Sequence, residues 1–389
     1  MQAFGERPEA GNHAVLVGVN INDPDYRDQL AELQLLASGA GLVVDQVVEG
    51  RRDRPDPALF VGRGKADEIA AALAATGASL VLFNRDLSPV QERNLERLLE
   101  CRVLDRTRLI LDIFSRRARS AEGQLQVELA QLRHQATRLV RGWTHLERQK
   151  GGIGVRGGPG ETQLEIDRRL ISERIRKLEG RLEKLQKSRG LHRRARQRRA
   201  ALSVSLVGYT NAGKSSLFNA LTRAGAYTAD QLFATLDTTS RRLWLPGDGG
   251  GQSVILSDTV GFITGLPHTL VAAFHATLEE AAYADLLLHV VDSASPTREQ
   301  QMDAVAGVLA EIGAAEVPQI VVMNKTDLTG AHPGVARDEY GKIARVFLSA
   351  KTGAGIDSLR LALTEFVHDR GLSQGAAQTE MEDDHNGLE

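Results

Sequence analysis

The sequence has little of several features that would restrict its class. It contains a single cysteine, Cys101, among 389 residues. One cysteine excludes an internal disulfide and is typical of a reducing compartment. No apolar run approaches the roughly 20 residues of a membrane span. The first residues, 1–8, lack the basic and then apolar order of a signal peptide. These absences predict a cytoplasmic protein.

The formal net charge is also small, at −2, but it conceals a local excess. Residues 138–199 contain 19 Lys or Arg against 7 Asp or Glu. A basic segment in a near-neutral protein indicates an anionic partner such as nucleic acid. The alternative interpretation is a solvated, charged helix face. At the other extreme, residues 380–384 are mostly acidic, and the segment 371–389 is predicted to be a disordered tail.

Residues 1–118 alternate between strand-like and helix-like patterns, which predicts a small α/β domain on a largely parallel sheet. Within it, Gly62–Lys65 follows an expected strand and opens an expected helix. Such a turn is able to hold an anion, although a plain turn between strand and helix is the favoured interpretation. The expected strands are 14–19, 42–48, 59–61, 79–83 and 101–105, and the expected helices are 28–38, 66–75 and 89–99.

Residues 119–200 carry two heptad seams separated by a glycine-rich loop at 151–160, so a long antiparallel helical hairpin is expected. A turn needs far fewer glycines than this loop contains. The loop is therefore interpreted as a probe for structured RNA at the tip of the hairpin. The Arg-rich stretch 189–199 is expected to be a connector suited to phosphate contact. The seam residues are Leu125, Leu129, Leu132, Ala136, Leu139, Trp143 and Leu146, then Leu164, Ile171, Ile175, Leu178, Leu182 and Leu185.

One stretch, Gly208–Ser216, matches the phosphate-binding pattern G-x-x-x-x-G-K-[ST] at every fixed position. A buried strand is expected before it, at 202–207, and a helix after it. Backbone N–H groups of such a loop surround a phosphate chain, and the helix dipole adds a favourable field. Lys214 is expected to reach the β- and γ-phosphates, and Ser215 to hold Mg²⁺. The alternative is a glycine turn that binds nothing, and it is disfavoured because the eight-residue pattern has few accidental matches in this context.

Strands and helices alternate from 201 to 370, which predicts a doubly wound, mostly parallel sheet. Asp258 ends one strand and is expected to hold Mg²⁺ through water, while Gly261 donates its N–H to a γ-phosphate. Asp327 follows another strand, and its carboxylate accepts from both N1–H and the N2 amino group of guanine. Adenine lacks this pair of donors, so Asp327 selects GTP. The loop 349–351 is expected on the other side of the base.

In this order and spacing, the elements resemble the G1, G3, G4 and G5 motifs of the translation-factor-related GTPases. The stretch Phe233–Asp237 together with Asp258–Phe262 resembles the HflX family, as do residues 151–162 with 165–169. The resemblance covers nearly the whole chain, to about residue 369. It implies GTP hydrolysis linked to binding of the 50S ribosomal subunit and splitting of stalled or idle 70S ribosomes. It also implies contact with rRNA, with the hairpin tip toward the peptidyl-transferase region.

By this resemblance, Thr235 is the switch I threonine that joins Ser215 on Mg²⁺ when GTP is bound. Lys214, Thr235 and Gly261 are expected to act in catalysis, in a protein that works as a monomer. The residues predicted to bind GTP are Gly208, Tyr209, Thr210, Asn211, Ala212, Gly213, Lys214, Ser215, Ser216, Phe233, Ala234, Thr235, Leu236, Asp237, Asp258, Thr259, Val260, Gly261, Asn324, Lys325, Thr326, Asp327, Ser349, Ala350 and Lys351.

The catalytic machinery of the predicted GTPase has one gap. Ras-like enzymes place a water-orienting glutamine directly after D-x-x-G, whereas this chain has Phe262. Hydrolysis is therefore expected to be slow alone and to need a partner. Asn211 resembles the P-loop asparagine that holds K⁺ in cation-dependent GTPases, and a loop-stabilising side chain explains it equally well. His268 and His275 follow the D-x-x-G motif, but structural histidines are commoner than catalytic bases.

Three hypotheses of function stand on these residues. The leading one is a GTPase that couples its nucleotide state to separation of the ribosomal subunits. The second is a GTP-gated module that docks on RNA or the ribosome during assembly or hibernation, with hydrolysis only as a reset. The third, a GTPase of RNA modification or ribosome assembly, is disfavoured because the chain has no catalytic cysteine motif.

Overall fold

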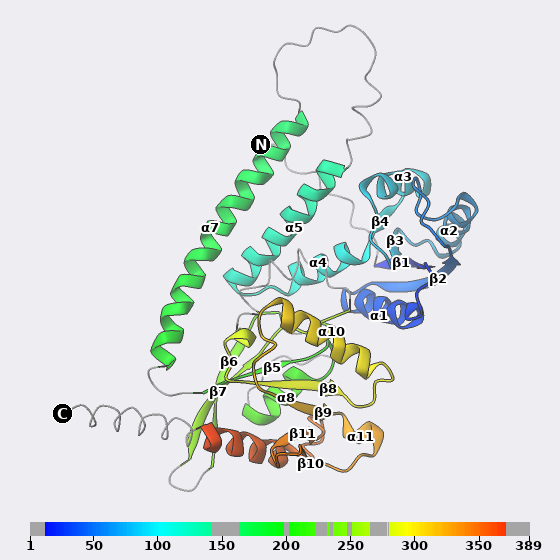
Figure 1. Ribbon diagram of the computed structural model, residues 1–389. Coiled ribbons are helices and arrows are strands. Elements are labelled where there is room, and N and C mark those ends of the chain that lie inside the picture. Colours follow the sequence, from blue (N-terminus) through cyan, green and yellow to red (C-terminus); the bar gives the residue numbers. More distant parts are fainter. Residues whose placement is uncertain are drawn as a thin grey trace, which may run out of the picture. The chain divides into compact units, whose positions relative to one another are not determined.

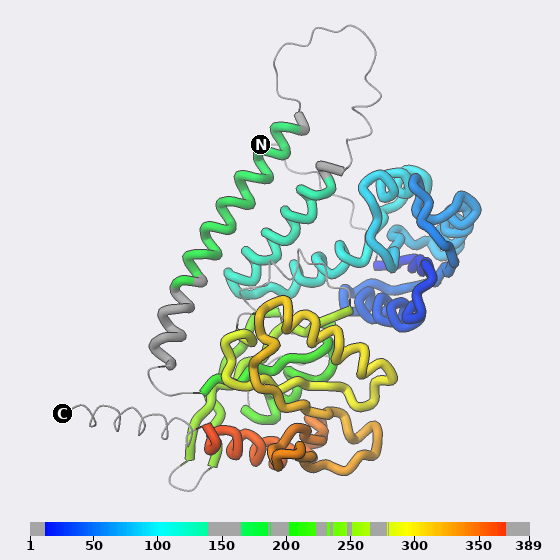
Figure 2. The backbone as a smooth tube through the Cα atoms, in the orientation of Figure 1, coloured from blue at the N-terminus to red at the C-terminus, as the bar shows by residue number. Residues whose placement is uncertain are grey.

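The computed structural model describes residues 12–141, 163–197, 202–222, 232–233, 236–246, 251–264, 278 and 280–370. By their contacts, the described residues up to Leu185 form one compact unit, and those from Gln186 onward form a second. Figures 1 and 2 colour both units along the chain. The four-part division expected from the sequence, with boundaries after residues 118, 200 and 370, stays a prediction.

The sheet of the first unit is parallel throughout its described strands, in the order β2-β1-β3-β4. The two central strands, β1 and β3, are almost wholly buried, as the apolar runs of a sheet covered on both faces require. The predicted α/β fold is confirmed. Its strands are β1 (His13–Asn20), β2 (Val43–Arg51), β3 (Leu80–Phe83) and β4 (Arg102–Leu104), and its helices are α1 (Tyr26–Gly39), α2 (Arg63–Thr76), α3 (Pro89–Leu99) and α4 (Arg106–Arg117).

The short strand expected at 59–61 was wrong. Phe60 has φ +64° and makes only an isolated antiparallel bridge with Asp56. Its ring packs edge-on against Phe83, with the ring centroids 6.1 Å apart. The apolar run therefore reflects a turn that enters the core rather than a strand. Directly after this turn, Lys65 of α2 donates from Nζ to the main-chain oxygen of Glu49 at 2.8 Å.

Two long helices, α5 (Ala121–Arg141) and α7 (Gln163–Gln197), run antiparallel (Figure 1). Ion pairs join Arg133 to Glu179 and Arg174 to Glu128 across this hairpin. The helix α7 reaches Gln197, so most of the Arg-rich stretch expected as a connector is helical. The structure describes the backbone but not the side chains of Leu139 and Leu164. The described residues do not include Trp143, Leu146 or the loop 151–160. The predicted seam is confirmed at Leu129, Leu178 and Leu182, which are buried, and at Leu125, Leu132 and Ile175, which pack against them.

The described part of the second unit contains a seven-stranded sheet in the order β10-β11-β9-β8-β5-β7-β6. Its five inner strands are parallel, and the edge strands β6 and β10 are antiparallel to their neighbours. The predicted doubly wound sheet is confirmed. The strands are β5 (Ser203–Val207), β6 (Thr239–Leu245), β7 (Gln252–Asp258), β8 (Leu286–Asp292), β9 (Gln319–Asn324), β10 (Gly334–Arg337) and β11 (Ile343–Phe347).

Helices pack on the sheet of the second unit and bury an apolar core that includes Phe218, Val290 and Leu363. None of the helices in the described part of the chain is long and apolar enough to cross a membrane. The helices of this unit are α8 (Lys214–Thr222), α10 (Arg298–Glu311), the short α11 (Thr326–Thr329) and a helix at 356–370.

Candidate functional site

The stretch that matches the phosphate-binding pattern forms a tight turn between β5 and α8. Two of its glycines have positive φ, +147° at Gly208 and +94° at Gly213, which L side chains rarely adopt. A Cβ at Gly208 would lie 2.2 Å from the main-chain oxygen of Val290, and one at Gly213 would lie 2.2 Å from Nδ2 of Asn324. The turn therefore needs glycine at both positions, for its backbone and for its neighbours.

Lys214 begins α8 with its side chain folded back into this turn. Its Nζ donates to the main-chain oxygens of Gly208 at 3.0 Å and of Tyr209 at 2.9 Å. Burial lowers the pKa of Lys214 to about 8, an effect that the negative charge of Asp258 opposes. The lysine is thus a buried cation whose acceptors are neutral carbonyls, in the loop expected to surround phosphates.

Ser215 and Asp258 are brought together although 43 residues separate them. The Oγ of Ser215 donates to Oδ2 of Asp258 at 2.7 Å. The contact exists because β7, which ends at Asp258, pairs in parallel with β5, which leads into the P-loop. A hydroxyl and a carboxylate oxygen side by side are the hard donors that Mg²⁺ prefers, so these residues fit the predicted ion.

Asn324, at the end of β9, joins three of the predicted motifs. Its Nδ2 donates to the main-chain oxygen of Ala212 at 2.8 Å, and its Oδ1 accepts from the N–H of Ala350 at 2.9 Å. The side chain is 2% exposed, so both bonds are shielded from water. A single buried amide therefore holds the P-loop and the loop after β11 in register with the strand that leads to Asp327.

The strand β8 supports the residues next to Asn324. Ser293 donates from its N–H at 2.9 Å and from Oγ at 2.7 Å to the main-chain oxygen of Asn324. Lys325 has φ +64°, and its Nζ lies 2.7 Å from Oδ2 of Asp292. Asp327, the residue predicted to select guanine, follows with an exposed side chain. Asp292 and Ser293 belong to none of the predicted motifs, because the pairing of β8 with β9 is not visible in the sequence of the N-K-x-D loop.

The D-x-x-G segment lies directly against the P-loop. The N–H of Thr210 donates to the main-chain oxygen of Phe262 at 2.7 Å, and the N–H of Phe262 donates to that of Gly208 at 3.2 Å. The side chain of Phe262 is 1% exposed. The residue in the place of the Ras-like glutamine is thus part of the core. Thr259 is also buried, and its hydroxyl donates to the main-chain oxygen of Leu206 at 2.6 Å.

Some predicted residues lie outside the described part of the chain, namely Ala234 and Thr235 of the expected switch I, and His268 and His275. Phe233 and Leu236, which flank Ala234 and Thr235 in the chain, are described and buried. A further histidine, His289, lies buried in β8. Burial, and then the positive charge of Lys214, lowers its pKa to about 4. The burial of His289 was predictable from the sequence, because this residue lies within the apolar run 286–291.

One edge of a parallel sheet thus carries the P-loop, the Ser215–Asp258 pair and the N-K-x-D loop, and these define the class as a P-loop GTPase. Three family models match the chain in turn, described as GTP-binding GTPase N-terminal over 27–115, GTP-binding GTPase Middle Region over 117–196, and 50S ribosome-binding GTPase over 203–325. The chain belongs to the HflX family of GTPases.

Relatives in this family span most of the chain. It is 58% identical to the GTPase HflX of Escherichia coli (strain K12), over 92% of this chain and 84% of that protein. It is 50% identical to the GTPase HflX of Magnetococcus marinus, over 87% of this chain and 77% of that protein. A solved structure of a GTP-binding protein from the archaeon Sulfolobus solfataricus in complex with GDP is 25% identical, covering 92% and 99% with a TM-score of 0.47.

Proposed function

We propose that this GTPase binds GTP with its phosphates in the turn at Gly208–Ser216 and its base between Asp327 and the loop 349–351. The observation that carries this assignment is Asn324, whose buried amide joins the P-loop to the loop after β11. Mg²⁺ would be held directly by Ser215 and by Thr235 of switch I, and through water by Asp258. When bound, the ion neutralises charge on the phosphates.

The proposed partner is the large ribosomal subunit, and the proposed outcome is separation of stalled or idle 70S ribosomes. Two findings support this. The family model that matches 203–325 is described as a 50S ribosome-binding GTPase. The helix α7 also exposes a series of basic side chains of the kind that contact RNA phosphates, Arg168, Arg176, Lys177, Arg181 and Lys184 among them. The alternative is a GTP-gated docking switch in assembly or hibernation, in which hydrolysis only resets the protein.

Hydrolysis is proposed to depend on the partner and on K⁺. Phe262 is buried in the position of a water-orienting glutamine, so the missing group must come from elsewhere. Asn211 has φ +61° in the middle of the P-loop, beside the expected phosphates. A potassium ion held there would supply the charge that an arginine finger supplies in related enzymes. A loop-stabilising role for Asn211 is the competing interpretation, and the cation dependence of turnover separates the two.

The test is GTP turnover with and without purified 50S subunits, measured in K⁺ and again in Na⁺. A strong rise with subunits, larger in K⁺, is expected. Little rise with subunits would overturn the ribosome assignment, and equal rates in the two salts would overturn the K⁺ site alone. A second measurement follows 70S splitting by light scattering.

Bulky residues in place of Gly157 and Gly158, which lie outside the described residues, are expected to abolish splitting and to leave intrinsic hydrolysis intact. Gly180→Ala on α7 is the matched control, because a Cβ there meets nothing within 4 Å. This variant is expected to split ribosomes as the unsubstituted protein does. Splitting that survives the tip substitutions would overturn the role of the tip, whereas failure of the unsubstituted protein to split ribosomes would favour the docking switch.

A further inference from the structure

Tyr209 fills the second position of the P-loop, where the motif accepts any residue. Its side chain is 8% exposed, and its hydroxyl contacts Thr264, three residues beyond Gly261. The N–H of Thr264 donates to the Tyr209 hydroxyl at 2.8 Å, and the Thr264 Oγ1 lies 2.8 Å from the same oxygen. A P-loop side chain is thus bonded to the segment that follows the D-x-x-G motif.

The main chain of the two segments is joined at the same place. Tyr209 and Phe262 form a parallel bridge, through the bonds from Thr210 to Phe262 and from Phe262 to Gly208. Backbone bonds therefore hold the segment at Phe262, and the Tyr209 side chain holds it again at Thr264. Two attachments two residues apart restrict the segment far more than either one does alone, because little conformational freedom remains between them.

Gly261 lies immediately before these attachments and is packed on the P-loop. A Cβ at this position would lie 2.8 Å from Cγ2 of Thr210 and 3.0 Å from Nζ of Lys214. The backbone of Gly261 is thus within a short reach of the lysine ammonium. Under the proposed function, the γ-phosphate contacts both the Lys214 ammonium and the Gly261 N–H. The position of Gly261 accordingly decides how well a third phosphate is bound.

We propose that Tyr209 is a positioning residue that holds the Gly261 N–H ready for the γ-phosphate and so favours GTP over GDP. The inference rests on the proposed placement of the phosphates in the P-loop. A preorganised donor gives its bond to the ligand without first losing conformational entropy. GDP ends before Gly261 and gains nothing from this arrangement. Tyr209 therefore acts on the difference between the two nucleotides rather than on guanine nucleotide binding as a whole.

The test is Tyr209→Phe, with the affinities for GDP and for a non-hydrolysable GTP analogue measured by titration calorimetry. The variant keeps the ring and removes the hydroxyl. Analogue affinity is expected to fall about fivefold to tenfold, the usual effect of one or two lost hydrogen bonds, with GDP affinity unchanged. Thr264→Val removes one of the two contacts and keeps the N–H, so a smaller loss is expected. The double variant is expected to lose no more than Tyr209→Phe, since both substitutions disrupt one attachment.

Tyr340→Phe is the matched control, because that side chain is 79% exposed on the same unit. It is expected to change neither affinity. Equal weakening of GDP and the analogue, no change, or tighter analogue binding by Tyr209→Phe would each overturn the role of Tyr209. Failure of the unsubstituted protein to bind GDP would instead overturn the proposed nucleotide site. Thermal unfolding of each variant shows whether the fold has been kept.

Discussion

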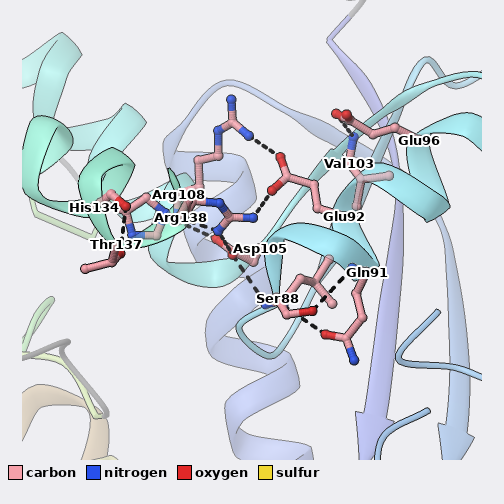
Figure 3. A network of polar contacts seen from close by, with 11 residues as sticks. Ser88, Gln91, Glu92, Glu96, Val103, Asp105, Arg108, His134, Thr137 and Arg138 are labelled. Atoms are coloured by element: carbon pink, nitrogen blue, oxygen red, sulfur yellow. Dashed lines mark hydrogen bonds and ion pairs between the residues drawn. The ribbon is translucent and has the colours of Figure 1, made fainter. Parts of the chain in front are cut away.

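The two sheets of this protein, one parallel and one mostly parallel, carry charged groups at the carboxyl ends of their parallel strands, but these groups find different partners in the two units. In the second unit, the Lys214 ammonium donates to two neutral main-chain oxygens. In the first unit, the Arg138 guanidinium meets two carboxylates, Glu92 and Asp105, the latter at 3.0 Å (Figure 3). Arg108 meets Glu92 as well. Lys214 lies among neutral carbonyls where a phosphate anion is expected to bind, whereas Arg138 is neutralised by carboxylates of the protein itself.

The helix starts at these edges show the same contrast. In the first unit, Ser88 caps α3 through a capping box with Gln91, and Asp105 caps α4 by accepting from the N–H of Arg108 at 2.8 Å. In the second unit, α8 begins after Gly213, which has no side chain to cap it. Doubly wound sheets bind ligands at this edge. Such an edge is open to a ligand only where the protein's own side chains have not already paired with its helix N–H groups and its charges.

This comparison predicts that the network around Arg138 stabilises the first unit and plays no part in nucleotide binding. Arg138→Met keeps most of the side-chain volume and leaves the carboxylates of Glu92 and Asp105 without one donor. Asp105 is 2% exposed, so the loss is costly. We expect the opening free energy of the α3 and α4 amides to fall by about 3 kcal/mol, measured by native-state hydrogen exchange. GDP affinity is expected to stay unchanged.

Arg93→Met provides the control for that experiment, because Arg93 lies on the exposed side of α3. A surface substitution of this kind is expected to change stability by about 0.5 kcal/mol or less. Hydrogen exchange in Arg138→Met equal to that of the control would show that the network is not structural. A loss of GDP affinity in Arg138→Met would break the comparison from the other side.

The glycine turn predicts a large effect confined to the second unit. In Gly213→Ala, the new Cβ meets Nδ2 of Asn324 at 2.2 Å and the backbone is held at φ +94°. The strain and the displaced amide together are expected to weaken GDP binding about 100-fold, equivalent to roughly 2.7 kcal/mol. Fluorescence titration with labelled GDP measures this. Gly307→Ala in α10, where a Cβ meets nothing within 4 Å, is expected to bind normally. A normal affinity in Gly213→Ala would contradict the fit of this turn around Asn324.

The sequence predicted the second unit more fully than the first for a physical reason. Phosphate and guanine binding restrict residue types at fixed spacings, so Lys214, Asp258 and Asn324 are recognisable before any fold is known. Contacts between side chains follow no such spacing. Arg138 reaches Asp105 across 33 residues, and Lys325 reaches Asp292 across the same separation. The strand wrongly predicted at Phe60 is an error of another kind. An apolar run indicates that residues are buried, but it does not specify that they form a strand.

The smallest effect concerns the charge of Lys214 itself. Burial lowers its pKa to about 8, so the ammonium is fully present below pH 7 in the ligand-free protein and is lost as the pH rises through 8. A phosphate binds only the charged form. Above pH 7, where the terminal phosphate of GDP is already largely ionised, GDP affinity is therefore expected to fall by about tenfold at most between pH 8 and 9. Calorimetry in buffers of different ionisation enthalpy is expected to show proton uptake on binding at pH 8.5.

In Lys214→Arg, the guanidinium does not titrate in this range, so the proton uptake is expected to disappear even though binding is weaker. Uptake that persists in the arginine variant would assign the proton to another group and would remove the contrast between Lys214 and Arg138.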